Sequence, residues 1–241
     1  MFDGGEVLRG STNGRKADNA VQRKTQQRPM KTTDSLTILV SSTVYGVEEL
    51  LDRVYVVLTQ YGYDVWMSHK GTMPVLPDRS NFENCLAAVE ACDLFLGIIT
   101  PQYGSGTPAK GQRSITHEEL LKAIELDKPR WILAHDQVVF ARSLLRGLGY
   151  DTAAKREALS LKKSPVIDDL RVVDMYEAAI RNDIQIKDRK GNWVQKFVTP
   201  QDAQLFASAQ FYRYQEVEEF IKMQLANRSA VRSRLDGKGR P

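Results

Sequence analysis

The sequence predicts an α/β protein in which a mostly parallel β-sheet is flanked by helices. Two observations predict this class. Four short runs rich in apolar residues alternate with three amphipathic segments between residues 36 and 135, and the third run, 94–100, is apolar almost throughout. Such runs are typical of strands that are covered on both faces. Because segments of helical length connect them, the crossovers should be right-handed and the strands parallel.

The predicted strands and helices follow one another from residue 36 onward. The strands are expected at 36–40, 63–68, 94–100 and 130–134, with helices near 47–58, 82–89 and 116–127 between them. Glu48 and Glu49 fall in the first turn of the first helix, where the helix dipole favours negative charge. The second helix is expected to begin with a cap at Asp78, Ser80 or Asn81.

Beyond residue 135 the sequence predicts one more helix, ending near Gly149, and then a C-terminal extension. The extension is expected to contain a helix opened by Pro165, a hairpin with strands at 184–186 and 193–198 around a five-residue loop, and a long helix from Thr199. The expected order is therefore an α/β domain at 35–149, followed by a helix-hairpin-helix extension at 150–227 that packs on it.

The positive charge of the chain is concentrated at its two ends. Residues 1–34 carry seven Lys or Arg and four Asp or Glu, and residues 228–241 carry five against one. Within the total of +4, residues 35–227 therefore have a net charge of −3. Polar ends without an apolar period are typical of disordered tails, so no specific nucleic-acid partner is predicted.

Cys85 and Cys92 are the two cysteines of the chain. Their separation of seven residues places both on one face of a helix, where we expect reduced core thiols. The sequence contains no secretory signal peptide and no apolar run of membrane-spanning length, which predicts a cytoplasmic protein without a membrane partner. It also lacks zinc-ligand, Walker and Ser-His-Asp patterns, which disfavours a metal site and those classes of enzyme.

Open parallel sheets bind ligands beyond the carboxyl ends of their strands, where the strand order reverses. In a flavodoxin-like order this point lies between the first and third strands. The candidate ligand-binding residues there are Ser41, Ser42 and Thr43 after the first strand, Thr100, Tyr103 and Gly104 after the third, and Ser114 and Thr116 at the start of the next helix. The N-terminal end of that helix suits an anionic or phosphate-bearing ligand.

Glu119 is the candidate catalytic residue because of the helix face on which it lies. It shares a side with Ala123 and Leu126, which places it at the sheet edge, whereas Glu118 is expected to face solvent and pair with Lys122. A carboxylate at the sheet edge can stabilise the cationic sugar that forms when a glycosidic bond breaks, or attack its anomeric carbon.

The candidate residues also have structural interpretations. Thr116 and Glu119 have the T-x-x-E spacing of a capping box, and the residues alone favour this role over catalysis. Gly104 and Gly106 form only a G-x-G fragment that ordinary turns explain, and His117 is expected to be exposed. Three aromatic residues can either stack on a nicotinamide or adenine ring or simply pack: Tyr45, Trp66 and Tyr103.

The most specific motifs of the chain lie in three segments. They are LTILVSST at 36–43, ENCLAAVEACDLFLGIITPQYGSG at 83–106 and SITHEELLKAIELDKP at 114–129. Over a span of about residues 36–135, they resemble an uncharacterised family of TIR-like domains found at the front of NTPase-type bacterial defence and signalling proteins. The resemblance implies a fold near those of TIR domains and nucleoside deoxyribosyltransferases, which cleave N-glycosidic bonds with a glutamate early in the corresponding helix.

Carried over by position, that glutamate is Glu119, so the resemblance favours catalysis over capping. It implies that NAD⁺ or another nucleotide is the substrate and that no cofactor is bound. A nucleoside deoxyribosyltransferase remains an alternative, as does a nucleotide-sensing or protein-assembly module that turns nothing over. The expected partners are a nucleotide-type small molecule, together with further copies of the chain or a separate regulatory protein.

Overall fold

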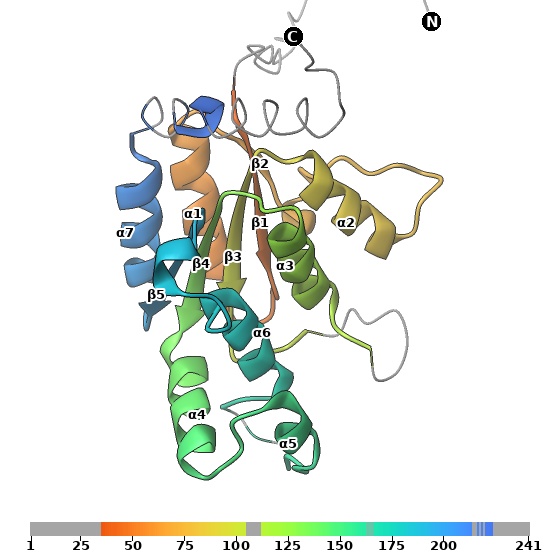
Figure 1. Cartoon of the computed structure of the whole chain (residues 1–241). Coiled ribbons are helices and arrows are strands. Elements are labelled where there is room, and N and C mark those ends of the chain that lie inside the picture. Colours follow the sequence, from red (N-terminus) through yellow and green to blue (C-terminus); the bar gives the residue numbers. More distant parts are fainter. Residues whose placement is uncertain are drawn as a thin grey trace, which may run out of the picture. The chain divides into compact units, whose positions relative to one another are not determined.

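The structure is a computed structural model, and it describes residues 35–104, 112–162, 164, 166–213, 216, 218 and 220–223. Within these residues the chain forms a five-stranded sheet flanked by helices (Figure 1), so the predicted α/β class is confirmed. The two predicted basic tails, Gly106 and Pro165 lie outside the described residues.

All five strands of the sheet are parallel and follow the order β2-β1-β3-β4-β5. Their bounds are β1 Thr37–Ser42, β2 Asp64–Trp66, β3 Leu94–Ile99, β4 Arg130–His135 and β5 Asn192–Phe197. The chain leaves β1 toward one edge to form β2 and then returns to the other side of β1 to form β3. The strand order therefore reverses between β1 and β3, as predicted from the sequence.

Up to residue 213, the described residues contain seven α-helices and two short 3-10 helices, and the last helix follows the last strand. They are α1 Glu48–Gln60, η1 Ser68–Lys70, α2 Asn81–Ala91, α3 Ile115–Glu125, α4 Asp136–Gly147, α5 Ala153–Glu157, α6 Arg171–Ile180, η2 Ile186–Asp188 and α7 Pro200–Phe211. Of the three residues considered as the cap of α2, Ser80 is the one used. It forms a capping box with Glu83, which leaves fewer unpaired N–H groups at the helix start.

Helices cover both faces of the sheet (Figure 1). α1 and α7 pack on one face, and α2, α3 and α6 pack on the other. The alternation of side chains along β1 explains this arrangement, because Ile38 and Val40 join the core under α1 whereas Leu39 joins the core under α2. With both faces covered, all six residues of β3 are buried, which is why that run is apolar.

The predicted hairpin in the C-terminal part is wrong. Residues 186–188 form η2 rather than a strand, and β5 pairs in parallel with β4, with Trp193 opposite Trp131. Neighbouring parallel strands need a crossover connection. The connection from β4 to β5 contains α6, which packs on one face of the sheet. The buried Arg130 joins the two strands, since its Nε donates to Asn192 Oδ1 at 2.8 Å.

α7 completes the other face of the same sheet. Phe206 and Phe211 belong to one apolar cluster with Leu50 of α1, and the ring centroid of Phe211 lies 5.0 Å from that of Trp131 on β4. Thr199 caps α7 and Pro200 occupies its first turn, as the sequence predicted for the start of the last helix. Residues beyond 149 therefore contribute a strand and helices to the main core.

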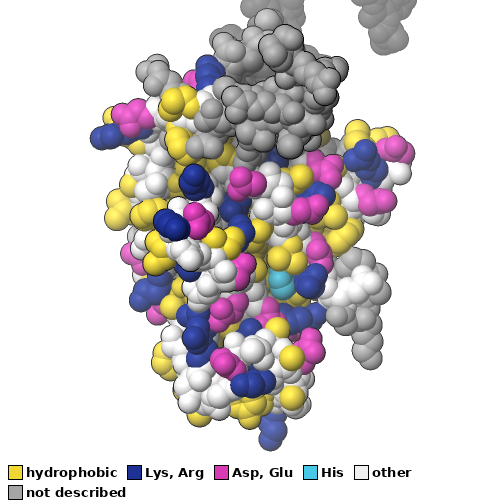
Figure 2. Space-filling model, in the orientation of Figure 1, with side chains coloured by type: hydrophobic (Ala, Val, Ile, Leu, Met, Phe, Trp, Pro, Cys, Tyr) yellow, Lys and Arg dark blue, Asp and Glu magenta, His cyan; other side chains and the backbone are white. Residues whose placement is uncertain are grey.

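The surface in Figure 2 carries Lys or Arg and Asp or Glu side chains in mixed order over the described residues. Many of them are paired, for example Arg142 with Glu177 at 2.6 Å. On the face drawn there, charges of one sign do not gather into a single patch. None of the helices that the structure describes is both long and apolar enough to cross a bilayer.

Candidate functional site

A cavity of about 610 Å³ opens at the carboxyl end of β1, beside the N-terminal ends of α2 and α3. It lies where the strand order reverses, which is the position expected for a ligand site in such a sheet. Residues 39–45 form one wall, and the other walls are formed by Ser68, Gly71, Met73, Val75, Asn81, Asn84, Cys85, Gly104, Ser114, Ile115, Thr116 and Glu119.

The structure brings together seven of the ten residues predicted for the site: Ser41, Ser42, Thr43, Gly104, Ser114, Thr116 and Glu119. The other three, Trp66, Thr100 and Tyr103, do not line the cavity. Trp66 Nε1 instead donates to Asp64 Oδ2 at 3.1 Å on the edge strand β2. Of the three aromatic candidates, Tyr45 is the one that lines the cavity, and its side chain is exposed.

Glu119 points from α3 toward the end of β1. Ser41 Oγ donates a hydrogen bond of 2.5 Å to Glu119 Oε2, and both residues are buried. The capping-box interpretation is wrong, because Ser114 is the cap of α3 and its Oγ accepts the N–H of His117. The helix thus begins two residues earlier than the T-x-x-E spacing implies. This places Glu119 in the second turn, where its carboxylate faces the cavity rather than the helix start.

Burial raises the pKa of Glu119 from 4.5 to about 7, and the hydrogen bond from Ser41 acts against that rise. In return, burial and the Glu119 charge raise the pKa of the Cys85 thiol to about 12. At neutral pH the carboxyl group therefore exists in both protonation states, whereas the thiol keeps its proton and can donate it. A carboxyl group with a pKa near the working pH suits proton transfer and charge stabilisation.

The loop after β3 is held against the end of β1 by two buried threonines. Thr43 Oγ1 and Thr100 Oγ1 are 2.6 Å apart, and both lie 3.0 Å from the carbonyl oxygen of Gln102. Gly104 follows with φ of +87°, and a Cβ atom there would lie 2.6 Å from Thr43 Cγ2. Glycine is required here both by its backbone conformation and by the close approach of Thr43.

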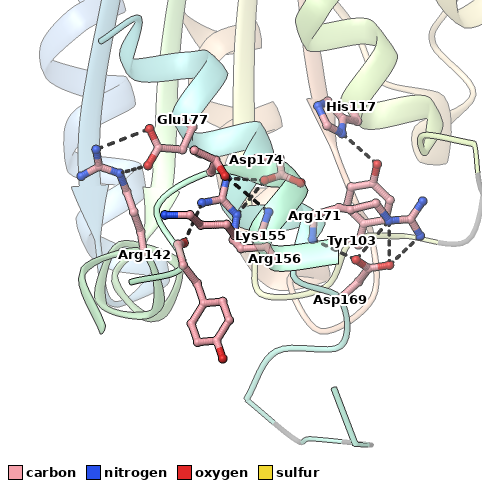
Figure 3. Close-up of polar contacts among 11 residues, drawn as sticks. Tyr103, His117, Arg142, Lys155, Arg156, Asp169, Arg171, Asp174 and Glu177 are labelled. Atoms are coloured by element: carbon pink, nitrogen blue, oxygen red, sulfur yellow. Dashed lines mark hydrogen bonds and ion pairs between the residues drawn. The ribbon is translucent and has the colours of Figure 1, made fainter. Parts of the chain in front are cut away.

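Tyr103 and His117 form a buried pair next to Ser114 (Figure 3). The Tyr103 hydroxyl lies 2.8 Å from His117 Nδ1 and accepts the Ser114 N–H at 3.2 Å. The prediction that His117 is exposed is wrong, since only 4% of its surface is accessible. Its burial, together with the charges of Arg113 and Arg171, lowers its pKa to about 4. His117 is therefore neutral at neutral pH and serves to hold the loop.

Residues just before α6 and in its first turn bind the loop that follows β3. Asp168 Oδ1 accepts the Tyr103 N–H at 2.8 Å, and Arg171 lies over the Tyr103 ring, 4.3 Å from its centroid (Figure 3). Arg171 also pairs with Asp169 and donates to the carbonyl oxygen of Gln112 at 2.8 Å. The segment for which the sequence predicted only packing therefore holds Tyr103 and Gln112, which both precede α3.

The charged residues on the outer face of α3 pair differently from the prediction. Glu118 lies 3.3 Å from Arg113, and Lys122 pairs with Glu90 of α2 and with Glu125. The predicted partner of Lys122 was Glu118. The approach of α2 to α3 explains the change, because it brings Glu90 within 3.4 Å of Lys122.

Asn84 and Cys85 of α2 are among the cavity residues that the sequence did not predict. The predicted apolar stripe of α2 passed through Phe82, Leu86 and Val89. Of these Val89 is buried, and the buried side also contains Asn84, Cys85 and Ala88. Asn84 holds the loop before α2, because its Oδ1 accepts the Leu76 N–H at 2.8 Å. In the sequence, the polar Asn84 beside Cys85 was the one available signal that this face of α2 borders a cavity rather than a purely apolar core.

The donor set at the cavity consists of hydroxyl, amide, thiol and carboxyl groups. Within the described residues no group of three or more His, Cys, Asp or Glu side chains is arranged to hold a metal ion. Glu119 is the one carboxyl group among the described residues that line the cavity. The arrangement combines this group with the hydroxyls of Ser42 and Thr116, which can bind the polar groups of a ligand.

Comparison with known families identifies one match. The model of a domain of unknown function (DUF4062) matches residues 37–205. No protein of curated function matches the chain. The matched region continues past the span of about 36–135 that carries the sequence resemblance, and it includes β5 and the beginning of α7. It covers well over half of the sequence, so the chain belongs to the DUF4062 family.

Proposed function

We propose that this protein cleaves the N-glycosidic bond of NAD⁺ or another nucleotide and that Glu119 is its catalytic residue. One observation carries the proposal: Glu119 is the one carboxyl group among the described residues that line the cavity, and Ser41 holds it there. The resemblance to TIR-like domains supports the same residue independently, because their glutamate falls at this position.

The proposed reaction is hydrolysis. The bond between the anomeric carbon and the base nitrogen breaks, and the base leaves with the electron pair. The Glu119 carboxylate stabilises the cationic sugar, as carboxylates do in glycosidases. Water then adds to the anomeric carbon and loses one proton, so NAD⁺ and water give ADP-ribose, nicotinamide and a proton.

The surrounding groups suit a nucleotide. Ser42 and Thr116 supply hydroxyls, and the N–H groups at the start of α3 favour negative charge such as phosphate. Tyr45 offers an exposed ring at the rim against which a base can stack. The carboxylate form is required, and the pKa of Glu119 is raised to about 7, so the rate should rise with pH through that value.

The test measures nicotinamide release from NAD⁺ by the purified protein at low and at high protein concentration. We expect turnover by the wild type and its loss in Glu119→Gln, which keeps the shape of the side chain but cannot carry the charge. Glu118→Gln is the matched control, because Glu118 is the next residue and pairs with Arg113 outside the cavity. Full activity in Glu119→Gln would refute the catalytic role.

The same experiment separates the alternatives. Only 6% of the Glu119 surface is accessible and its carboxylate is already hydrogen-bonded, and this observation makes a nucleotide-binding module the second candidate. Such a module predicts saturable binding of NAD⁺ without product, and binding that survives Glu119→Gln. Exchange of bases between deoxynucleosides, with a covalent intermediate on Glu119, would identify a nucleoside deoxyribosyltransferase.

We further propose, from the resemblance, that the activity belongs to a bacterial defence or signalling response in which nucleotide loss limits growth. Expression of the wild-type chain in bacteria should then lower the cellular NAD⁺ level, and expression of Glu119→Gln should not. Equal NAD⁺ levels in the two cultures would contradict this setting even if the purified protein were active.

A further inference from the structure

The segment of residues 73–79, between η1 and α2, forms one wall of the cavity through Met73 and Val75. Two prolines lie within this segment, Pro74 and Pro77. Because proline fixes its own φ and has no N–H to donate, the segment has few backbone groups with which it can bind the rest of the protein. The position of the wall therefore depends on hydrogen bonds that other residues supply.

One side chain supplies these hydrogen bonds. Asn84 of α2 is 3% exposed, and its amide binds both backbone groups of Leu76. Oδ1 accepts the Leu76 N–H at 2.8 Å, and Nδ2 donates to the Leu76 carbonyl oxygen at 3.1 Å. Nδ2 also donates to the carbonyl oxygens of Arg79 at 3.2 Å and Ser80 at 3.1 Å. Within the part of the chain that the structure describes, no other side chain is hydrogen-bonded to the backbone of residues 73–79.

Val75 lies at the mouth of the cavity rather than at its floor. Val75 is 64% exposed and Tyr45 is 70% exposed, whereas Glu119 is 6% exposed. Val75 and Tyr45 are the two exposed large hydrophobic residues among the described residues that line the cavity. The part of a nucleotide that offers an apolar face to such side chains is the planar ring of its base.

We propose that Val75 and Tyr45 bind the base of a nucleotide at the mouth of the cavity, and that Asn84 is the positioning residue that holds Val75 there. The inference rests on the proposed function for the presence of a nucleotide, and it deepens that function by assigning a place to the base. Glu119 keeps its role in cleavage. Asn84 acts through the wall, so it should change the affinity for the base rather than the chemical step.

The first experiment tests whether Asn84 holds the wall. Asn84→Asp keeps the acceptor for the Leu76 N–H but replaces the donor with an oxygen that faces three carbonyl oxygens. Amide hydrogen exchange in a peptide of residues 73–80 should become about tenfold faster, the factor expected for the loss of one buried hydrogen bond. Asn81→Asp is the matched control, because Asn81 lies on the same helix and forms no hydrogen bond to residues 73–79. Exchange as slow in Asn84→Asp as in the wild type would overturn the positioning role.

The second experiment tests whether the wall contacts a base. Calorimetric titration of the full chain with AMP, GMP, CMP, UMP and nicotinamide mononucleotide would be compared with titration with ribose 5-phosphate, which has no base. Glu119→Gln serves as the background, so that no ligand is cleaved. Val75→Ser should weaken the binding of the nucleotides about fivefold to tenfold and leave the binding of ribose 5-phosphate unchanged. Because Val75 is largely exposed, this variant should fold even if Asn84→Asp does not.

Asn84→Asp should weaken the same nucleotides by a similar factor. The double variant should bind them no more weakly than either single variant, because Asn84 acts through Val75. Additive losses in the double variant, an equal loss for ribose 5-phosphate, or no binding of any of the five nucleotides would overturn the proposal. Base affinity that depends on Val75 in a wild-type protein without turnover would refute the proposed cleavage and leave this inference intact.

Discussion

The hydroxyl of Ser41 donates a hydrogen bond of 2.5 Å to the carboxylate of Glu119, a residue 78 positions later in the chain. The first residue ends a buried strand and the second lies in the second turn of a helix. Their contact fixes the direction of a carboxyl group whose burial favours its neutral form, and it partly offsets that effect of burial. The stability and the chemistry of the site therefore depend on the same buried charge.

Glu119→Gln should stabilise the protein at alkaline pH. The pKa of Glu119 is raised from 4.5 to about 7 in the folded chain, so its contribution to stability is present below 4.5 and lost as the pH rises through 7. Glutamine carries no charge at any pH and avoids this loss. Urea unfolding should show no difference between the two proteins at low pH and an advantage of about 3 kcal/mol for the variant above pH 7.

Glu118→Gln is the control for this stability measurement, because Glu118 lies on the same helix but is partly exposed beside Arg113. Glu118→Gln should not produce a gain in the free energy of unfolding that grows with pH. A constant difference between wild type and Glu119→Gln across the whole pH range would contradict the assignment of a raised pKa to Glu119.

His117 should make the protein less stable in acid. Its pKa is lowered from 6.5 to about 4 on folding, so the unfolded chain takes up the proton first as the pH falls. The contribution to stability is present above 6.5 and lost as the pH falls toward 4, and it amounts to about 3 kcal/mol. The free energy of unfolding should therefore fall as the pH falls from 6.5 to 4. His117→Asn in the Glu119→Gln background should remove this part of the pH dependence, and urea unfolding at several pH values would measure it. An unchanged pH dependence of the free energy of unfolding would show that the folded protein protonates His117 at little cost in free energy.

Gly104→Ala should destabilise the protein more than Gly149→Ala does. Both glycines have nearly the same conformation, with φ of +87° and +89°, so both variants should lose about 1–2 kcal/mol from the backbone alone. A Cβ atom at Gly104 would also lie 2.6 Å from Thr43, whereas Gly149 has open space around it. We expect an additional loss of about 1–3 kcal/mol for Gly104→Ala in chemical unfolding. Equal losses would mean that Thr43 moves aside freely.

A fragment of residues 35–149 should fail to fold cooperatively. It lacks β5 and α7, so it would expose the apolar surface of α1 and leave Arg130 without Asn192. A fragment of residues 35–223, which keeps these elements, should unfold in one sharp thermal transition followed by circular dichroism. A sharp transition in the shorter fragment would show that the first four strands form an independent domain.

The alternation of apolar and amphipathic segments determined the class of the fold and the place of the site. Runs such as 94–100 are typical of buried strands, and helices between them favour parallel pairing and a crevice at the strand ends. The face of α3 was also readable from spacing, because residues on one side of a helix recur every three to four positions. For this reason the sequence predicts Glu119 at the edge of the sheet, where the structure has the cavity.

Tertiary contacts decided the features of the fold and the site that the sequence did not determine. Whether α3 begins at Thr116 or Ser114 depends on which side chain is free to cap it, and the pairing of 193–198 depends on where α6 packs. Cys85 lies on α2 and Glu119 on α3, so no local pattern in the sequence could reveal that both line the same cavity. Helical and strand periods report which side of an element is buried, but only the packed fold determines which side chains meet there, because such contacts join residues that are far apart in the chain.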